Sequence, residues 1–276
     1  FSDAPATISR AEVDHFCNQP GYTGYGNNGS VFDYYLANSI GQCRYRNVVT
    51  PYYRAGHPKS YYTDETVADG RRARELIVEA LSHFKANGFD FSALTADSSG
   101  KVYATNVFYA GPVVNGWSKG LWPHSWYLAS PVSLLPGKAA NDYQVTALGS
   151  ELDLGTFCHE NGHMLCDYPD LYDYGYESSG VGVWCLMCAG NFSEKNPTQI
   201  SAYLKRASGW ANSITVVQHA ATIALAPDTN DFAILAKDEA EYFLIENRAK
   251  VGHDAQLPGG GLAIWHIDET GNNSNE

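Results

Sequence analysis

Apolar residues recur at helical spacing in two parts of the first hundred residues. Over Val67–Lys85 the apolar positions lie three or four residues apart, as one buried helix face requires. They are Leu76, Ile77, Ala80, Leu81 and Phe84. Asn87 and Gly88 follow as a stop signal, so the pattern predicts a helix over residues 67–85. A shorter apolar run, Ser30–Leu36, predicts a second helix.

Strand patterns lie in the middle and C-terminal parts of the chain. Lys101–Ala110 is a β-branched and aromatic run that predicts a central strand. Gly111–Asn141 is rich in Gly, Pro and Trp and has little periodicity, which predicts long loops of the kind that carry binding sites. From Ile214 onward, alternating segments predict a β-rich portion, and in it Gly261–Asp268 is expected to be a buried strand.

Two further helices are predicted from their start and stop signals. Ser150 and Asp153 have the spacing of a capping box, so a helix is expected to begin near Ser150 and to end before Pro169. Asn196–Pro197 has the composition of a helix start, and Gly209 marks the end of that helix.

Length and charge limit the classes of function. The 276 residues suffice for one large core, and the mixed pattern predicts an α/β (α+β) fold. We expect a main domain over residues 1–212 and a β-rich portion over 213–276 packed on it. The net charge of -12 repels phosphate backbones, which argues against nucleic acid as a partner. No apolar run is long enough to predict a membrane span. The chain opens in mid-sequence, on Phe1–Asp3, so any upstream segment is expected to have been removed.

The chain has 6 cysteines, an even number that indicates disulfides in an exported protein. Cys17 and Cys43 flank one Gly- and Asn-rich stretch and form the natural local pair. The other four lie close together in sequence: Cys158, Cys166, Cys185 and Cys188. A competing interpretation makes those four a tetrahedral zinc site, although only the last two have CxxC spacing.

The segment His159-Glu160-Asn161-Gly162-His163 carries the most specific chemistry. Residues four apart lie on one face of a helix, so His159 and His163 can offer two imidazole nitrogens to one zinc ion. Glu160 is placed to take the proton of a zinc-activated water as that water attacks a peptide carbonyl. The alternative is a pair of hydrogen-bonded histidines on a helix face. The spacing favours a zinc peptidase.

A mononuclear zinc site needs a third protein ligand. The acidic residues just past the motif are Asp167, Asp170, Asp173 and Glu177. Pro169 breaks the helix, which places Asp170 to fold back as the provisional third ligand. Alternatively, these acids form a calcium site that stiffens the turn, or make surface hydrogen bonds.

Two other side chains are candidates for a role at the site. His124, between Trp122 and Trp126, would bind substrate by lining the cleft or stabilising an oxyanion, and packing between the tryptophans is the alternative. Met187, taken alone, is most simply core filler. A serine nucleophile has no support, because no Gly-x-Ser-x-Gly segment is present.

Residues 159–173 resemble the signature of the immune inhibitor A family of secreted bacterial zinc peptidases, in which HExxH precedes a Gly-containing turn and Pro-Asp-x-Tyr-Asp. Other blocks resemble that family in the same order along nearly the whole chain: Phe1–Asp3, Gly29–Tyr35, Gly88–Ser92, Leu121–His124, Trp184–Met187 and Gly261–Asp268. The resemblance implies a metzincin-like zinc fold in which Met187 forms the turn beneath the metal. It also implies export as a proenzyme with an N-terminal prodomain, and often bound calcium.

The chain departs from the family pattern at two places. The family places Gly third and Asp sixth after the second histidine, whereas here Cys166 is third, Pro169 sixth and Asp170 seventh. The family often carries an acidic calcium loop after the Asp-Phe-Ser block, but the loop Thr95–Gly100 has one carboxylate. Calcium takes about six to eight oxygen ligands, so this loop is expected to be a poor calcium site.

The sequence therefore predicts a secreted zinc endopeptidase that acts on proteins or peptides. His159 and His163 are the predicted ligands, Asp170 the provisional third ligand, and Glu160 the general base. The rival is a catalytically silent binding or adhesion module that retains the fold and the metal. The intact Glu160 argues against that rival, because a module without catalysis has no need of it.

Overall fold

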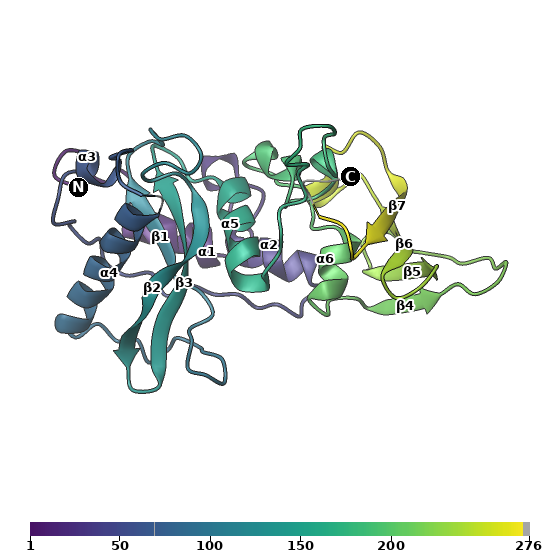
Figure 1. Cartoon of the computed structure of the whole chain (residues 1–276), viewed down its shortest axis with the longest axis horizontal. Coiled ribbons are helices and arrows are strands. Elements are labelled where there is room, and N and C mark those ends of the chain that lie inside the picture. Colours follow the sequence, from purple (N-terminus) through teal and green to yellow (C-terminus); the bar gives the residue numbers. More distant parts are fainter. Residues whose placement is uncertain (69, 273–276) are drawn as a thin grey trace. The chain divides into compact units, whose positions relative to one another are not determined.

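The computed structural model describes residues 1–68 and 70–272. Its contacts divide the chain into two compact units, each discontinuous in sequence (Figure 1). Unit 1 contains residues 1–17 and 47–167, and unit 2 contains residues 18–46 and those from 168 onward. Both units mix helices with strands, which confirms the α+β class. The predicted boundary between residues 212 and 213 falls inside unit 2 and stays a prediction.

Unit 1 is built on a three-stranded sheet with the order β1-β3-β2. Its strands are β1 (Asn106–Ala110), β2 (His124–Leu135) and β3 (Lys138–Leu148). β1 pairs parallel to β3, and β2 pairs antiparallel to it. The prediction of a central strand over Lys101–Ala110 is wrong in position and length. The longer β3 takes the centre, and β1 begins only at Asn106 and lies at the edge.

The region predicted as loops, Gly111–Asn141, contains β2 and the start of β3, so that prediction is wrong. The two strands form a hairpin around Pro136 and Gly137, and Gly137 has a φ of +79°. Pro followed by Gly is a turn signal, and glycine adopts positive φ without steric cost. Register shifts in β2 hide the alternation by which a strand is recognised in a sequence.

Helices cover both faces of this sheet (Figure 1). Helix α4 (Arg71–Ala86) packs on the face that carries Tyr109 and Tyr143. Helix α5 (Leu154–Cys166) packs on the opposite face, where the ring of Phe157 stacks on that of Phe108 at 4.8 Å. Adjacent strand residues point to opposite faces, as Phe108 and Tyr109 do here. α4 begins after Gly70, later than predicted, and residue 69 of the predicted helix lies outside the described residues.

Unit 2 has a four-stranded sheet with the order β4-β5-β6-β7. The strands are β4 (Ser213–Val216), β5 (Asp231–Ala236), β6 (Glu241–Arg248) and β7 (Gly261–Asp268), which confirms the predicted β-rich portion. Phe232, Leu244 and Tyr242 form its core with Ala202 of helix α6 (Ala202–Ala207). β7 was expected to be buried, but it is an edge strand whose residues alternate between exposed and half-buried.

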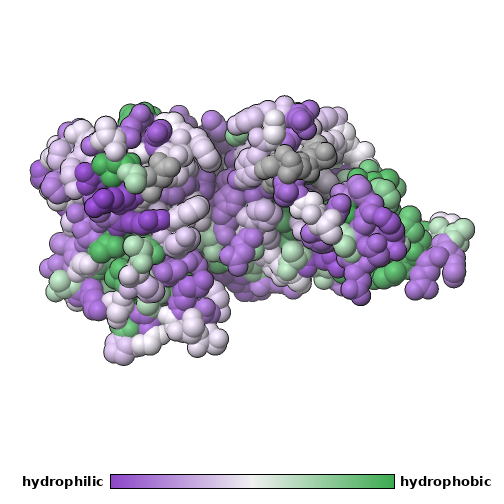
Figure 2. Space-filling model, viewed as in Figure 1, coloured by the Kyte–Doolittle hydropathy of each residue, from purple (hydrophilic) through white to green (hydrophobic). Residues whose placement is uncertain are grey.

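The outer face of this second sheet is apolar. Phe243, Leu262 and Ile264 are between 43% and 64% exposed, and Figure 2 shows apolar side chains gathered over this sheet on the right of the view. The remaining elements are short: α1 (Arg10–Asn18), α2 (Val31–Asn38), α3 (Lys59–Tyr62) and the 3-10 helices Gly24–Gly26, Gly182–Trp184, Ala189–Ser193 and Gly252–Asp254. Among the described residues, no helix is long and apolar enough to cross a membrane.

The helix predicted from Asn196–Pro197 begins later, with Ser201 as N-cap, and ends before Gly209 as expected. The backbone N–H groups that would lie in the predicted first turn bond to distant side chains instead. Gln199 N–H donates to Asp254 and Ile200 N–H to Asn38. These long-range partners hold the segment extended, and the local start signal is overridden.

Candidate metal centre

Helix α5 carries the HExxH segment and is buried along most of its length. It begins at Leu154, because the Asp153 carboxylate accepts a hydrogen bond from the Gly155 N–H and so caps the helix. The predicted start near Ser150 is wrong, since Ser150 is exposed and precedes the cap. After Cys166 the chain leaves the helix through Asp167, which has left-handed φ and ψ of 54° and 31°.

His159 and His163 direct their imidazole rings toward each other on one face of α5. The two Nε2 atoms lie 3.1 Å apart, and the ring planes cross at 88°. Two nitrogen ligands on one tetrahedral zinc ion, each about 2.05 Å from it, would lie about 3.3 Å apart. The pair therefore has the spacing of two ligands of one small cation. Glu160, the next residue after His159, is 8% exposed.

Asp170 comes within reach of the two histidines. One ligand atom each from His159, His163 and Asp170 lies within 4.8 Å of the other two. Among the described residues this is the one group of three or more His, Cys, Asp or Glu side chains that could hold a metal ion. The alternative zinc site made of four cysteines is therefore not formed among the described residues. All three candidates come from one short stretch, residues 159–170.

The acidic side chains beyond α5 have different partners. Asp170 Oδ2 accepts a hydrogen bond of 2.7 Å from the hydroxyl of Tyr174. Asp173 is 6% exposed and accepts the backbone N–H groups of Glu177 and Ser178 at 2.8 and 2.5 Å. Asp173 thus closes its own turn, whereas Asp170 is oriented by a phenol. Tyr174 was not predicted, because an aromatic residue four positions past a candidate ligand carries no signal of its own.

Met187 lies fully buried in a turn, and its role beneath a metal stays a prediction. Its carbonyl accepts a hydrogen bond of 2.7 Å from the N–H of Leu171, the residue after Asp170. On the other side of the turn, Leu186 N–H donates to the Gln199 carbonyl at 3.3 Å. The Met187 turn is therefore tied at once to the segment that carries Asp170 and to the segment before α6.

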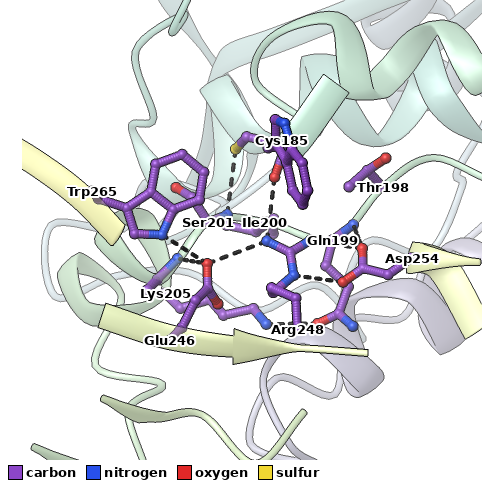
Figure 3. A network of polar contacts seen from close by, with 12 residues as sticks. Cys185, Thr198, Gln199, Ile200, Ser201, Lys205, Glu246, Arg248, Asp254 and Trp265 are labelled. Atoms are coloured by element: carbon purple, nitrogen blue, oxygen red, sulfur yellow. Dashed lines mark hydrogen bonds and ion pairs between the residues drawn. The ribbon is translucent and has the colours of Figure 1, made fainter. Parts of the chain in front are cut away.

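A buried ionic network holds the far side of this turn (Figure 3). The Arg248 side chain, 1% exposed, donates two hydrogen bonds of 2.5 and 2.6 Å to the Asp254 carboxylate. It also donates to Glu246 at 3.2 Å and to the Trp184 carbonyl at 3.3 Å. Asp254 in turn accepts the Gln199 N–H. Such a buried guanidinium is strongly held when all its partners are present, so the network fixes the backbone on both sides of the turn.

His124 is a buried residue of unit 1, with 6% exposure. Its ring stacks on Trp122 at 3.8 Å. Its Nδ1 lies 2.7 Å from the Trp122 carbonyl and its Nε2 lies 3.1 Å from the Tyr143 hydroxyl. Burial lowers the pKa of His124 to about 4. The stacking on Trp122 agrees with the alternative that His124 packs against a tryptophan. The substrate-binding role of His124 stays a prediction.

All six cysteines are thiols in this structure. Burial raises the pKa of the Cys17 and Cys158 thiols, the second of which directly precedes His159. Cys185 Sγ accepts the Ser201 N–H at 3.3 Å, and Cys188 lies in the same turn. The predicted disulfides, including the pair of Cys17 with Cys43, stay predictions.

The loop predicted to be a poor calcium site is held by its own chain. The single carboxylate of Thr95–Gly100 belongs to Asp97, and its Oδ1 accepts hydrogen bonds from the N–H groups of Ser99 and Lys101 at 2.8 and 2.9 Å. The Ser99 hydroxyl donates to the same oxygen at 2.7 Å and has the largest effect in lowering the pKa of Asp97, and the backbone N–H bonds lower it further. Asp97 therefore organises a tight turn between α4 and β1.

Comparison with known protein families agrees with this geometry. Residues 110–215 match the family model described as immune inhibitor A peptidase M6, catalytic domain. The matched range contains the β2–β3 hairpin, the whole of α5, Asp170 and Met187. No curated protein matches the chain. The resemblance seen in the HExxH segment and its surroundings is thereby confirmed.

Proposed function

We propose that this chain, in which residues 110–215 belong to the immune inhibitor A family of M6 peptidases, is a secreted zinc endopeptidase. The family match supports a metallopeptidase acting on protein substrates. The identity of the metal, the roles of single residues and the export are our proposals. The observation that carries them is the 3.1 Å separation of the His159 and His163 Nε2 atoms on a buried helix.

The donor set suits zinc. Two imidazole nitrogens and a carboxylate oxygen are a common set of protein ligands in catalytic zinc sites, and they leave a fourth position open. Zinc bound there would act as a Lewis acid and lower the pKa of a coordinated water to about 7. A hard cation such as calcium prefers a shell of oxygen ligands, which the two histidines do not supply.

The residues of the site would then have separate roles in the reaction. His159 and His163 would hold the metal through neutral nitrogens on adjacent helical turns. Glu160 accepts the proton of the attacking water and passes it to the leaving amine, as a general base that becomes a general acid. Burial of Glu160 keeps its carboxylate out of bulk water, where a proton would be exchanged with solvent. Tyr174 holds Asp170 in one orientation.

If the chain is exported, two further features are expected, a prodomain and disulfides. We infer that an N-terminal prodomain precedes this chain in a precursor, as the family resemblance implies. In an oxidising compartment some of the six thiols would pair, and mapping of disulfide-linked peptides from the exported protein would identify the pairs. Recovery of all six cysteines as free thiols from the culture medium would contradict this part of the proposal.

The decisive experiment compares the whole chain with its Glu160→Ala variant. Zinc content is measured after dialysis, and cleavage of a denatured protein substrate is followed in parallel. We expect one zinc per chain in both proteins and a loss of cleavage rate of about a thousandfold or more in the variant. Glu151→Ala, which removes an exposed carboxylate just before α5, is the matched control and keeps full activity.

Two outcomes would contradict the proposal. If Glu160→Ala keeps its zinc and cleaves at the rate of the unmodified chain, Glu160 is not the general base. If neither protein cleaves any denatured substrate although both bind zinc, the chain is a metal-retaining binding module of the same fold.

A further inference from the structure

Unit 1 contains a cavity of about 520 Å³ beside the outer edge of β1. Two stretches contribute every one of their residues to its lining, Thr105–Ala110 and Asn47–Ala55, and at one end the Asn106 amide donates a hydrogen bond of 2.7 Å to Asn47 Oδ1. Alternate residues of a strand point to opposite faces, so a lining of consecutive residues means that the cavity follows the strand edge. The cavity is thus a slot that follows the edge of β1 and is also lined by residues 47–55.

Helices form the two other walls of this slot. One wall is the apolar face of α4, including Ile77, Ala80 and Phe84. The opposite wall is made by Val13 of α1 and Phe157 of α5. Since α4 and α5 cover opposite faces of the sheet, the slot lies in the plane of the sheet, next to β1. Protein interiors are close-packed, so an apolar space of this size in the place of a strand calls for an occupant.

The backbone of β1 directs hydrogen-bonding groups into the slot. In a parallel ladder, alternate residues turn both their N–H and C=O groups toward the same neighbour. The Thr105 carbonyl and the Gly111 N–H bond to β3, so Val107 and Tyr109 face β3 and Phe108 and Ala110 face the slot. Among the described residues, β1 pairs with β3 alone, and residues 47–55 form no strand.

The two edges of this sheet are protected very differently. The edge strand β2 contains Pro131 and a register shift between Tyr127 and Val132, both of which prevent further strands from pairing. β1 reads Asn-Val-Phe-Tyr-Ala and has no proline, charge or bulge. An unprotected β-branched and aromatic edge is prone to pair with another chain. β1 is therefore expected to be covered by a strand rather than left open.

We propose that the slot binds one extended strand of another polypeptide, which pairs with β1 and adds a fourth strand to the sheet. The strand would be about five residues long, to match Asn106–Ala110. It would be apolar on both sides, because helices cover both faces of the sheet there. Main-chain hydrogen bonds to Phe108 and Ala110 would supply much of the affinity, as in other cases of strand addition.

Charge indicates what flanks the apolar strand. The charged side chains that line the slot are Arg10 and Arg54, and both are exposed; the Arg10 guanidinium also donates hydrogen bonds of 3.0 and 2.8 Å to the Val49 carbonyl. This is a local excess of positive charge on a chain with a net charge of -12. The partner strand is therefore expected to carry acidic residues beside its apolar run. The proposal does not depend on the peptidase activity.

The test uses a synthetic peptide with a five-residue core of alternating valine and isoleucine, flanked by two glutamates on each side. Binding to the whole chain is measured by fluorescence anisotropy, in the Glu160→Gln background so that the peptide is not cleaved. A matched peptide has the same side chains but is N-methylated at alternate core residues. We expect the N-methylated peptide to bind about tenfold more weakly or worse. Hydrogen exchange of the Phe108 and Ala110 amides should slow when the unmodified peptide binds.

Two substitutions on one helix locate the site. Ala80→Trp would fill the slot and abolish binding, whereas Val78→Trp, on the exposed side of α4, would leave it unchanged. If Ala80→Trp does not fold, Ala110→Pro removes one slot-facing N–H without touching the ladder to β3. Equal binding of both peptides, or tighter binding of dodecanoate without protection of the Phe108 and Ala110 amides, would overturn the proposal in favour of simple apolar uptake. No binding of the unmodified peptide would overturn it outright.

Discussion

At the scale of single residues, Asp167 explains the place of Asp170. The family pattern has Gly third and Asp sixth after the second histidine, an interval of three. Here the left-handed position at the end of α5 is Asp167, the fourth residue after His163. Asp170 again follows that position by three residues. One additional helical residue thus shifts the turn and the acid together, and aspartate tolerates left-handed backbone better than most residues.

Tyr174 should matter through Asp170. Removing its hydroxyl in Tyr174→Phe leaves one carboxylate oxygen without its orienting partner. Such partners of metal ligands typically contribute about tenfold or more to metal affinity. We expect a loss of zinc affinity of about tenfold, measured by competition with a chromophoric chelator. Tyr176→Phe, at a tyrosine that is 92% exposed, is the control. Unchanged affinity in Tyr174→Phe would argue against Asp170 as a ligand.

Because of the buried His253, we expect the stability of unit 2 to fall in acid. It is 9% exposed, and burial lowers its pKa from 6.5 to about 4. The unfolded chain therefore takes up a proton at a higher pH than the folded chain. The contribution of His253 to stability is complete above about pH 6.5 and is lost as the pH falls toward 4.

Urea unfolding at pH 7 and pH 4.5 measures this contribution. We expect the loss of unfolding free energy between these pH values to be smaller by roughly 2 kcal/mol in His253→Gln than in the unmodified chain. His219→Gln, at an exposed histidine, should show the loss of the unmodified chain. The same loss in all three proteins would contradict the prediction.

At the scale of elements, the two candidate caps of α5 can be separated. Ser150 is the cap that the capping-box spacing suggests, and Asp153 is the cap in the structure. Asp153→Ala should lower the unfolding free energy by about 1 kcal/mol, because the Gly155 N–H loses its acceptor. Ser150→Ala should change it by less than about 0.5 kcal/mol. Denaturant titration of both variants gives the comparison, and the reverse ranking would contradict the structure.

The elements that the sequence predicts well are those with local causes. The face of α4 and the strands from β4 to β7 follow from periodicity, and the histidine pair follows from the spacing of four on a helix. The elements that the sequence pattern predicts wrongly are determined by contacts between residues far apart in the sequence. Asp254 and Asn38 hold the residues before α6 out of a helix. Arg248 reaches Trp184 across 64 residues, so no local pattern could indicate the network around the Met187 turn.

At the scale of the whole molecule, the β-rich portion depends on residues outside it. Glu246 of β6 accepts the Ala202 N–H, and Ala202 belongs to the core of this sheet. Asn230 donates to the carbonyls of Asn38 and Trp210. These partners all precede residue 213, so a fragment of residues 213–276 would lose them together and leave buried polar groups unsatisfied.

We therefore expect a fragment of residues 213–276 not to fold. Its ¹H–¹⁵N correlation spectrum should show the narrow dispersion of an unfolded chain, whereas the whole chain should show wide dispersion and melt cooperatively. A dispersed spectrum and a cooperative melt of the fragment alone would establish residues 213–276 as an independent domain, with the boundary that the sequence pattern predicts.

The discontinuity of unit 2 also sets the order of events during synthesis. Residues 18–46 are synthesised early. The Asn38 carbonyl can accept its hydrogen bond from Asn230 only after a further 192 residues have been made. At about 5–20 residues per second, that interval lasts roughly 10–40 s. Until then α2 has only part of its native surroundings. Arg46 can cover Phe32 and Tyr45 can pack on Tyr35 at once, but the Tyr34 hydroxyl gains its acceptor only when Thr198 is made. The buried aromatic residues of α2 are thus incompletely covered during synthesis, and a chaperone that shields this helix should raise the folding yield.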